Sequence, residues 1–217
     1  SAPAQINVPR DYWTQVIDIE LPPIVRFERQ GGGKEAIENA AKLLSKAKFP
    51  VILSGAGVVL GGAIDECKKL AEKLDAPVCN GYQHNDSFPG SHPLAVGPLG
   101  YNGSKAAMEL ISKADVVLAL GTRLNPFSTL PGYGIDYWPK KATIIQVDMN
   151  PDRIGLTKKV SVGICGDAKQ VAQQILDKLS SDAGNTGREE RKNLIHKTKS
   201  AWLQTLSAVS YTHLRAH

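Results

Sequence analysis

Five residues have the types and positions expected of a nucleotide-binding site, because each follows closely after a short apolar run. Gly55 and Gly57 follow the run VIL, and small residues at such a turn let backbone N–H groups approach a phosphate. Gly121 and Arg123 follow VVLAL, and the planar guanidinium of Arg123 suits a phosphate or a carboxylate. Asp148 follows IIQV and could accept a hydrogen bond from a ribose hydroxyl.

Each of these residues also has a purely structural interpretation. The two glycines of the first turn could only permit close packing of a strand against a helix. Arg123 could form a surface ion pair, and Asp148 could cap the turn that contains Asn150. The glycine spacing is one residue longer than G-x-G-x-x-G, and Cys79-Asn80 stands where a ribose-binding acid would end the second strand. The sequence therefore predicts a nucleotide-shaped crevice that holds another ligand, or none, rather than an NAD site.

No catalytic centre is visible in the sequence. Ser54 lies in LSGAG, which is not the G-x-S-x-G nucleophile elbow, and no paired carboxylates or nucleophile–base pair are found. His84 and His92 lie eight residues apart among turn residues, so hydrogen bonding within a loop is favoured over metal binding. The three cysteines form no C-x-x-C pair, and we expect buried thiols in a reducing cytoplasm.

Apolar runs and helical periodicities alternate along the chain, which predicts a parallel α/β fold. We expect strands at 51–53, 77–80, 116–120, 143–147 and 160–164 and helices at 34–47, 63–74, 104–113 and 168–179. Ser104 and Asp167 are the expected N-caps of the last two helices. The predicted architecture is a doubly wound parallel sheet of five or six strands with helices on both faces, Rossmann-like and of the DHS-like nucleotide-binding type. In such sheets ligands bind outside the carboxyl ends of the strands.

Composition excludes several classes of function. The chain has 217 residues, 42% of them hydrophobic, which is enough for one sizeable domain with appendages. More than half of the net charge of +5 lies in residues 182–217, so the body is nearly neutral and nucleic-acid binding is not expected. No apolar run is long enough to cross a membrane and no signal peptide is visible, so we expect a cytoplasmic protein without membrane contact.

A series of motifs over residues 1–180 resembles the central domain of thiamine-diphosphate-dependent enzymes. They are NVPRDYW, FPVILSGAG, NDSFPGSHPL, GPLGYNGS, ADVVLALGTRLNPF, IIQVDMNPDRIG and ICGDA. Within the acetolactate-synthase superfamily, GYQHNDSFPGSHPL and LPGYGIDYWP are most similar to the sulfoacetaldehyde acetyltransferase family. The resemblance implies a fragment of a larger enzyme. Residues 1–13 would be the end of a pyrimidine-binding domain, and residues 14–33 would be a linker. The central domain would be 34–181. Residues 182–209 would be a linker and the start of a pyrophosphate-binding domain, and residues 210–217 would be a non-native tail.

The resemblance also implies a reaction and its cofactors. Sulfoacetaldehyde and phosphate would give sulfite and acetyl phosphate, with thiamine diphosphate and Mg²⁺ held by the flanking domains of a homodimer or homotetramer. No catalytic residue would lie in this chain, which alone should be inactive. FAD binding is not expected, because GTRLNPF at 121–127 keeps Gly121 and Arg123 of the related GARFDDR motif but lacks both acids and the final arginine. The alternatives are an acetolactate synthase or decarboxylase relative, and a non-catalytic nucleotide-binding regulatory module.

Overall fold

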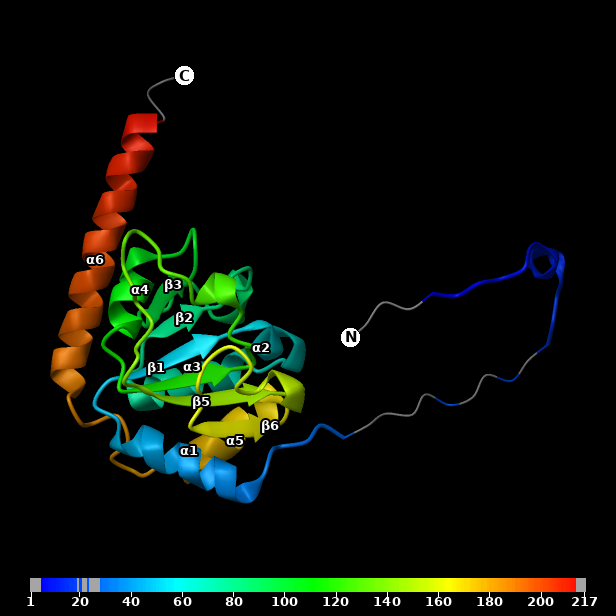
Figure 1. Ribbon diagram of the computed structural model, residues 1–217, viewed down its shortest axis with the longest axis horizontal. Helices are drawn as coiled ribbons and strands as arrows, with labels where there is room; N and C mark the ends of the chain where they lie inside the picture. The colour runs from blue at the N-terminus through cyan, green and yellow to red at the C-terminus, as the bar shows by residue number, and fades with distance from the viewer. Residues whose placement is uncertain (1–4, 19, 21–22, 24–27, 214–217) are drawn as a thin grey trace.

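The chain forms one six-stranded sheet in which all neighbouring strands are parallel. The computed structural model in Figure 1 describes residues 5–18, 20, 23 and 28–213. The strand order is β3-β2-β1-β4-β5-β6, which confirms the predicted α/β architecture. The strands are β1 Pro50–Ser54, β2 Val78–Asn80, β3 Ala95–Pro98, β4 Val116–Leu120, β5 Thr143–Asp148 and β6 Val162–Cys165.

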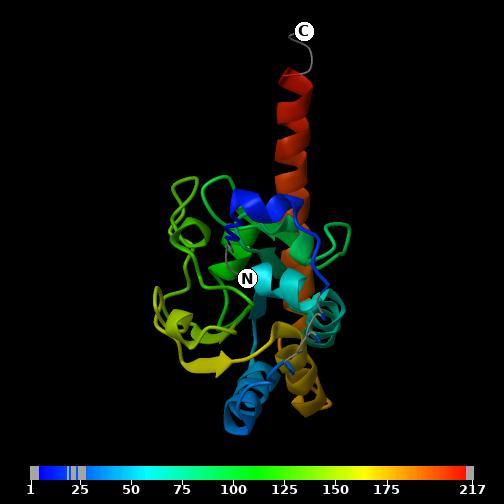
Figure 2. The ribbon, with the colours of Figure 1, turned by 90° about the vertical axis from the view of Figure 1, so that its right-hand side faces the viewer.

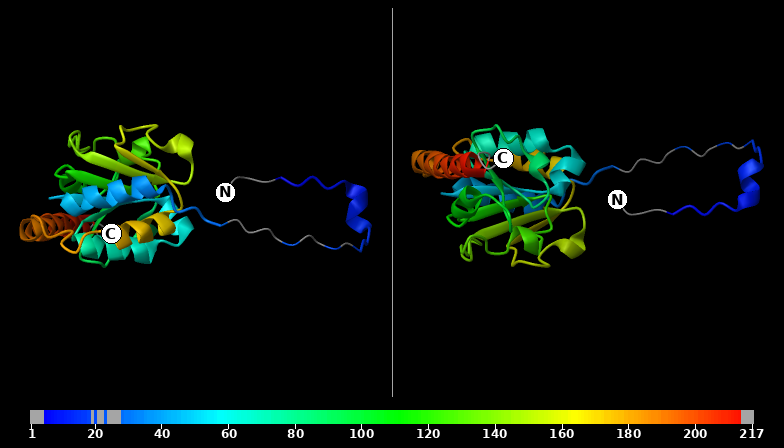
Figure 3. Two further views of the ribbon diagram at one scale, coloured as in Figure 1. Left: turned by 90° about the horizontal axis from the view of Figure 1, so that it is seen from below. Right: turned by 90° about the horizontal axis from the view of Figure 1, so that it is seen from above.

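Helices cover both faces of the sheet, but unequally. The α-helices are α1 Lys34–Lys46, α2 Ala56–Gly61, α3 Ile64–Leu74, α4 Lys105–Ile111, α5 Ala168–Lys178 and α6 Arg188–His213. Helix α5 contacts both α1 and α3 in one layer, whereas α4 packs against β2, β3 and α6. Figure 3 shows the two layers from below and from above. Central strands β1 and β4 are buried throughout, as expected for strands covered on both faces.

Two predicted N-caps are present. The side chain of Ser104 accepts a hydrogen bond from the backbone N–H of Ala107 at the start of α4. The carboxylate of Asp167 accepts hydrogen bonds from Lys169 and Gln170 at the start of α5. Both side chains satisfy N–H groups that have no partner inside the helix.

Two elements differ from the sequence prediction. Strand β3 lies at Ala95–Pro98, where the sequence analysis expects no strand. Glycine and proline usually interrupt strands. Pro98 is tolerated because β3 is an edge strand, where one side of the backbone needs no partner strand. Gly97 has a φ of 92°, and the pairing of β3 with β2 shifts register between Val78 and Cys79. The second difference is α2, where the sequence predicts only a turn. Gly62, with a φ of 65°, ends α2 and separates it from α3.

Helix α6 differs from the exposed helix that its polar sequence suggests. Arg191 and Ile195, near its start, are buried, whereas Leu203 and Leu206 are exposed. Figures 1 and 2 show the far part of α6 extending beyond the body. Of the predicted non-native tail, residues 210–213 continue α6, and 214–217 lie outside the described residues. Across the described part of the chain, no helix combines the length and apolar character that crossing a bilayer requires.

The three cysteines should react very differently with thiol reagents. Cys67 and Cys79 are buried, as predicted, and burial raises the pKa of Cys67 to about 12 and that of Cys79 further. Cys165 is exposed, so the prediction of a buried thiol is wrong there, because its strand lies at the edge of the sheet. We expect Ellman's reagent at pH 8 to titrate one thiol in the native chain and three after denaturation. Loss of native reactivity in Cys165→Ser would identify the site, and two reactive native thiols would contradict the burial.

Candidate functional site

All five predicted site residues line one cavity of about 780 Å³. The cavity lies at the carboxyl ends of the strands, where the strand order reverses between β1 and β4. Such a switch point opens a crevice, because the connections leave the two neighbouring strands toward opposite faces of the sheet. Its lining includes Gly55, Gly57, Gly121, Arg123, Asp148, Arg29, Gln83, His84, Asn150, Arg153 and Asp167.

The glycines hold the turn after β1 against the end of β4. A Cβ atom on Gly57 would lie 2.6 Å from the Cα of Gly121, and one on Gly55 would lie 2.6 Å from the Cβ of Thr122. The N–H of Gly57 donates to the carbonyl of Gly121 at 2.8 Å, and that of Gly55 to Leu120 at 3.1 Å. The close-packing role is therefore present. These two N–H groups are already paired within the protein, unlike those of a phosphate-binding turn.

The two charged residues of the predicted site have different surroundings. Arg123 is exposed, and among the described residues its guanidinium forms no ion pair, so the surface salt bridge is not seen. Asp148 is half-buried, and its Oδ1 accepts the N–H of Asn150 at 2.8 Å. The turn-capping role of Asp148 is thus present, and one carboxylate oxygen already has a partner.

Arg29, which the sequence did not indicate, borders one end of the cavity. Its Nη1 donates to the carbonyl of Gly61 at 2.5 Å and lies 3.2 Å from Oδ2 of Asp167. The side chain of Asp167 is only 2% exposed, and its backbone N–H donates to the carbonyl of Gln30 at 2.8 Å. The segment just before α1 is therefore fixed along the rim of the cavity.

Gln146 joins two cavity loops, one carrying Arg123 and the other Arg153. It is 1% exposed, and its Nε2 donates to the carbonyls of Thr122 and Arg153 at 3.1 and 3.2 Å. Its Oε1 accepts the N–H of Gly155 at 2.9 Å. This residue was not among those predicted from the sequence. The sequence did contain one signal for it, a single amide side chain within the apolar strand TIIQVD. Such a side chain is expected to be buried, and a buried polar group requires hydrogen-bond partners.

Two non-glycine residues beside the cavity have left-handed backbone conformations. Gln83 lines the cavity with a φ of 71°, and Leu124, next to Arg123, has a φ of 53°. Such conformations cost on the order of 1 kcal/mol or more each and occur preferentially at ligand-binding sites. They are consistent with a cavity shaped for a ligand.

The ring of His92 forms hydrogen bonds, as predicted, whereas Nδ1 of His84 lies 3.9 Å from Oδ1 of Asp86. Nε2 of His92 lies 3.2 Å from Oε1 of Glu72, and its Nδ1 accepts the N–H of Leu94. Within the described residues, no three or more His, Cys, Asp or Glu side chains are arranged to hold a metal ion.

Sequence comparison gives two close relatives. The chain is 78% identical over 210 residues to a protein of Rhizobium meliloti (strain 1021) named "Probable sulfoacetaldehyde acetyltransferase", covering 97% of this chain and 36% of the relative. It is 76% identical over 211 residues to a sulfoacetaldehyde acetyltransferase of Roseovarius nubinhibens, covering 97% of this chain and 35% of the relative. The chain thus spans about a third of the length of these relatives.

Structure and family comparisons agree on the fold. The chain superposes on a benzoylformate decarboxylase from Polynucleobacter necessarius with a TM-score of 0.64 and 23% identity, covering 82% of this chain and 33% of that one. At this identity the likeness concerns the fold alone. The family model of the thiamine pyrophosphate enzyme central domain matches residues 37–175, which include all six strands and most of the layer formed by α1, α3 and α5. The chain therefore belongs to the thiamine pyrophosphate enzyme family, of which it carries the central domain.

Proposed function

We propose that the whole protein is a sulfoacetaldehyde acetyltransferase, which converts sulfoacetaldehyde and phosphate to acetyl phosphate and sulfite. The observation that carries the proposal is the identity of 76–78% over 97% of the chain to relatives with that name. The family uses thiamine diphosphate, which supplies the carbanion chemistry when it is bound. We assign the thiamine diphosphate and its Mg²⁺ to the flanking parts of the protein, and no catalytic role to the residues of this chain.

The wider context is part of the same proposal. We propose a homodimer or homotetramer that acts in the cytoplasm on a small-molecule substrate during taurine breakdown. The predicted divisions at 13, 33, 181 and 209 remain a proposal for how this chain joins its neighbouring domains. The six strands and α1–α5 lie within 34–181, which supports that assignment for the central domain.

The test is an assay of the complete gene product. Full-length enzyme with thiamine diphosphate and Mg²⁺ should release sulfite and form acetyl phosphate from sulfoacetaldehyde plus phosphate. The same preparation is offered pyruvate as a control. Acetolactate formation from pyruvate without sulfite release would favour the acetolactate-synthase alternative and overturn the assignment.

We further propose that the cavity at the carboxyl edge is a nucleotide-shaped crevice, lined by Gly55, Gly57, Gly121, Arg123 and Asp148, that does not retain FAD. The cavity volume and the two left-handed residues support a ligand-shaped space. Two observations count against diphosphate binding at the turn after β1. The N–H groups of Gly55 and Gly57 are already hydrogen-bonded within the protein, and α2 is six residues long.

Calorimetry of the 217-residue chain with FAD, NAD, ADP and coenzyme A tests this assignment. We expect dissociation constants above about 100 µM, which correspond to binding free energies weaker than roughly −5.5 kcal/mol. Micromolar or tighter binding by the isolated chain would instead favour the nucleotide-binding regulatory module.

A further inference from the structure

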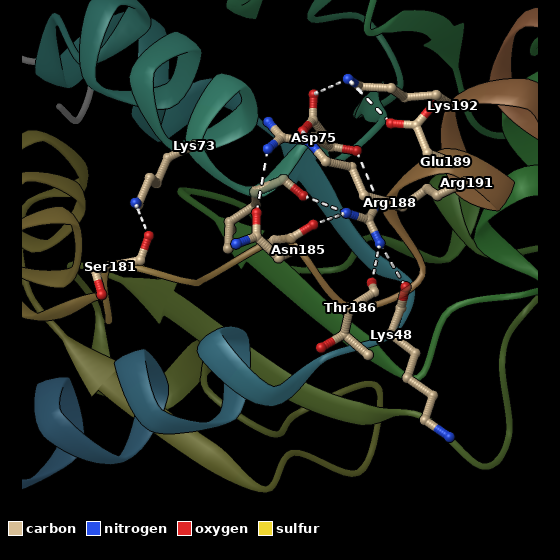
Figure 4. Close-up of polar contacts among 12 residues, drawn as sticks. Lys48, Lys73, Asp75, Ser181, Asn185, Thr186, Arg188, Glu189, Arg191 and Lys192 are labelled. Atoms are coloured by element: carbon tan, nitrogen blue, oxygen red, sulfur yellow. Dashed lines mark hydrogen bonds and ion pairs between the residues drawn. The ribbon is translucent and has the colours of Figure 1, made fainter.

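Arg191 is a wholly buried cation on a helix that is otherwise largely exposed. Its side chain is in the first turn of α6, and the residue is 1% exposed. All five guanidinium N–H donors meet backbone carbonyl oxygens (Figure 4). Nε donates to Asp75 at 3.0 Å, Nη1 to Lys48 at 2.6 Å and Thr186 at 2.8 Å, and Nη2 to Leu74 at 2.9 Å and Gly184 at 2.5 Å.

The five carbonyls come from three separate segments. Lys48 follows α1, Leu74 and Asp75 end α3, and residues 184–186 precede α6. The carbonyl ends of helices carry partial negative charge, which favours a cation at that position. A buried guanidinium is tolerated only when its donors are satisfied, and here all five are. Arg191 therefore joins the start of α6 to the ends of two helices of the body.

A second group of charges surrounds the carboxylate of Asp75, whose side chain is 13% exposed. This carboxylate forms an ion pair with Arg188 and lies 4.0 Å from the Nζ of Lys192. The side chain of Lys192 is 45% exposed, and so exposed an ion pair contributes little to stability. Lys192 therefore provides a matched position against which the effect of Arg191 can be judged.

Farther along, α6 packs beside α4. Ile195 is buried, Lys199 donates to the carbonyls of His92 and Pro93, and Trp202 meets the ring of Tyr133 edge-on. Beyond Trp202 the described side chains are exposed. The helix thus rests on the body over its first part and leaves it in a direction fixed near its start.

We infer that Arg191 is the docking residue that sets the direction of α6 against the sheet, and hence the position of any part of the polypeptide that continues beyond α6. This role concerns how the central domain is joined to its C-terminal neighbour, and it does not depend on the proposed reaction. The shape of the planar guanidinium matters as well as its charge. A lysine in its place has three donors on one nitrogen atom and cannot reach carbonyls on three sides.

Hydrogen–deuterium exchange on the 217-residue chain tests the docking role. In Arg191→Met and in Arg191→Lys, the amides of residues 188–208 should exchange roughly 30-fold faster or more, while those of β1 and β4 change much less. Lys192→Met removes the neighbouring cation, whose side chain is 45% exposed, and should change exchange in α6 by less than about threefold. Equal acceleration in α6 and in the strands would overturn the inference, as would failure of both Arg191 variants to fold, because Arg191 would then be a general core residue.

A distance measurement tests the direction itself. Spin labels at exposed positions 109 on α4 and 204 on α6, in a Cys165→Ser background, report the separation of the two helices. Narrow distance distributions are expected for the parent and for Lys192→Met, and broad ones for both Arg191 variants. A narrow, unshifted distribution in Arg191→Met would overturn the inference.

Discussion

Replacing Gly121 with alanine is expected to lower the free energy of unfolding by about 3 kcal/mol or more, through backbone strain and overpacking together. Gly121 has a φ of 61°, and a Cβ atom there would lie 2.7 Å from both the Cα of Gly57 and the N of Val58. Neither atom can move without displacing the start of α2. Urea unfolding followed by circular dichroism and linear extrapolation measures the change.

Two further glycines separate the causes of this effect. Gly134→Ala has the same left-handed requirement, with a φ of 73°, but no atom within 4 Å of the new methyl group, and should lower the free energy of unfolding by about 1 kcal/mol. Gly90→Ala has neither constraint and should stay within about 0.5 kcal/mol. If Gly121→Ala were no worse than Gly134→Ala, the close contact between the ends of β1 and β4 would not matter to stability.

Replacing Gln146 with leucine is expected to lower the free energy of unfolding by about 3 kcal/mol, because the new side chain leaves buried polar groups unpaired. Leucine has nearly the same volume as glutamine, so the loss of stability does not come from a new cavity. The carbonyls of Thr122 and Arg153 lose a donor, and the N–H of Gly155 loses its acceptor. The same urea titration reports the change, and near-ultraviolet circular dichroism reports the packing around the cavity.

Gln173→Leu is the matched control for that substitution. Gln173 lies on α5, is partly exposed, and donates to Oδ1 of Asp177 at 2.7 Å. Its replacement should change the free energy of unfolding by no more than about 0.5 kcal/mol. Equal effects at the two positions would show that Gln146 does not hold the two cavity loops together.

The sequence predicted the elements whose signals are local. Apolar runs located five of the strands, and the caps at Ser104 and Asp167 were predictable because these side chains bond to the next turn of their own chain. The placement of the predicted site residues around one cavity was predictable from a rule about parallel sheets, because each of them lies at the end of a strand or within three residues after it. These predictions required no knowledge of distant contacts.

The missed features depend on partners far away in the chain. Strand β3 contains a glycine and a proline, and only its edge position makes them acceptable. Arg191 lies in the polar run REERK, which is typical of a solvated helix surface. Two of its partners are carbonyls 116 and 117 residues away, and backbone carbonyls leave no mark in the sequence. Arg29 contacts residues 32 and 138 positions away for the same kind of reason.

Because the strands are parallel, the cavity and the carbonyl cluster around Arg191 lie at opposite ends of the strands. The cavity lies at the carboxyl ends, and the carbonyl cluster lies at the amino ends. Lys48 precedes β1 and Asp75 precedes β2, whereas the cavity lies where β1 and β4 end. A five-residue strand spans about 17 Å, beyond the range at which substitutions usually interact. The energetic effects of changes at the two ends should therefore add. Natural variation could then alter which ligand the crevice accepts without redirecting α6, so that ligand preference and domain geometry can diverge separately in this fold.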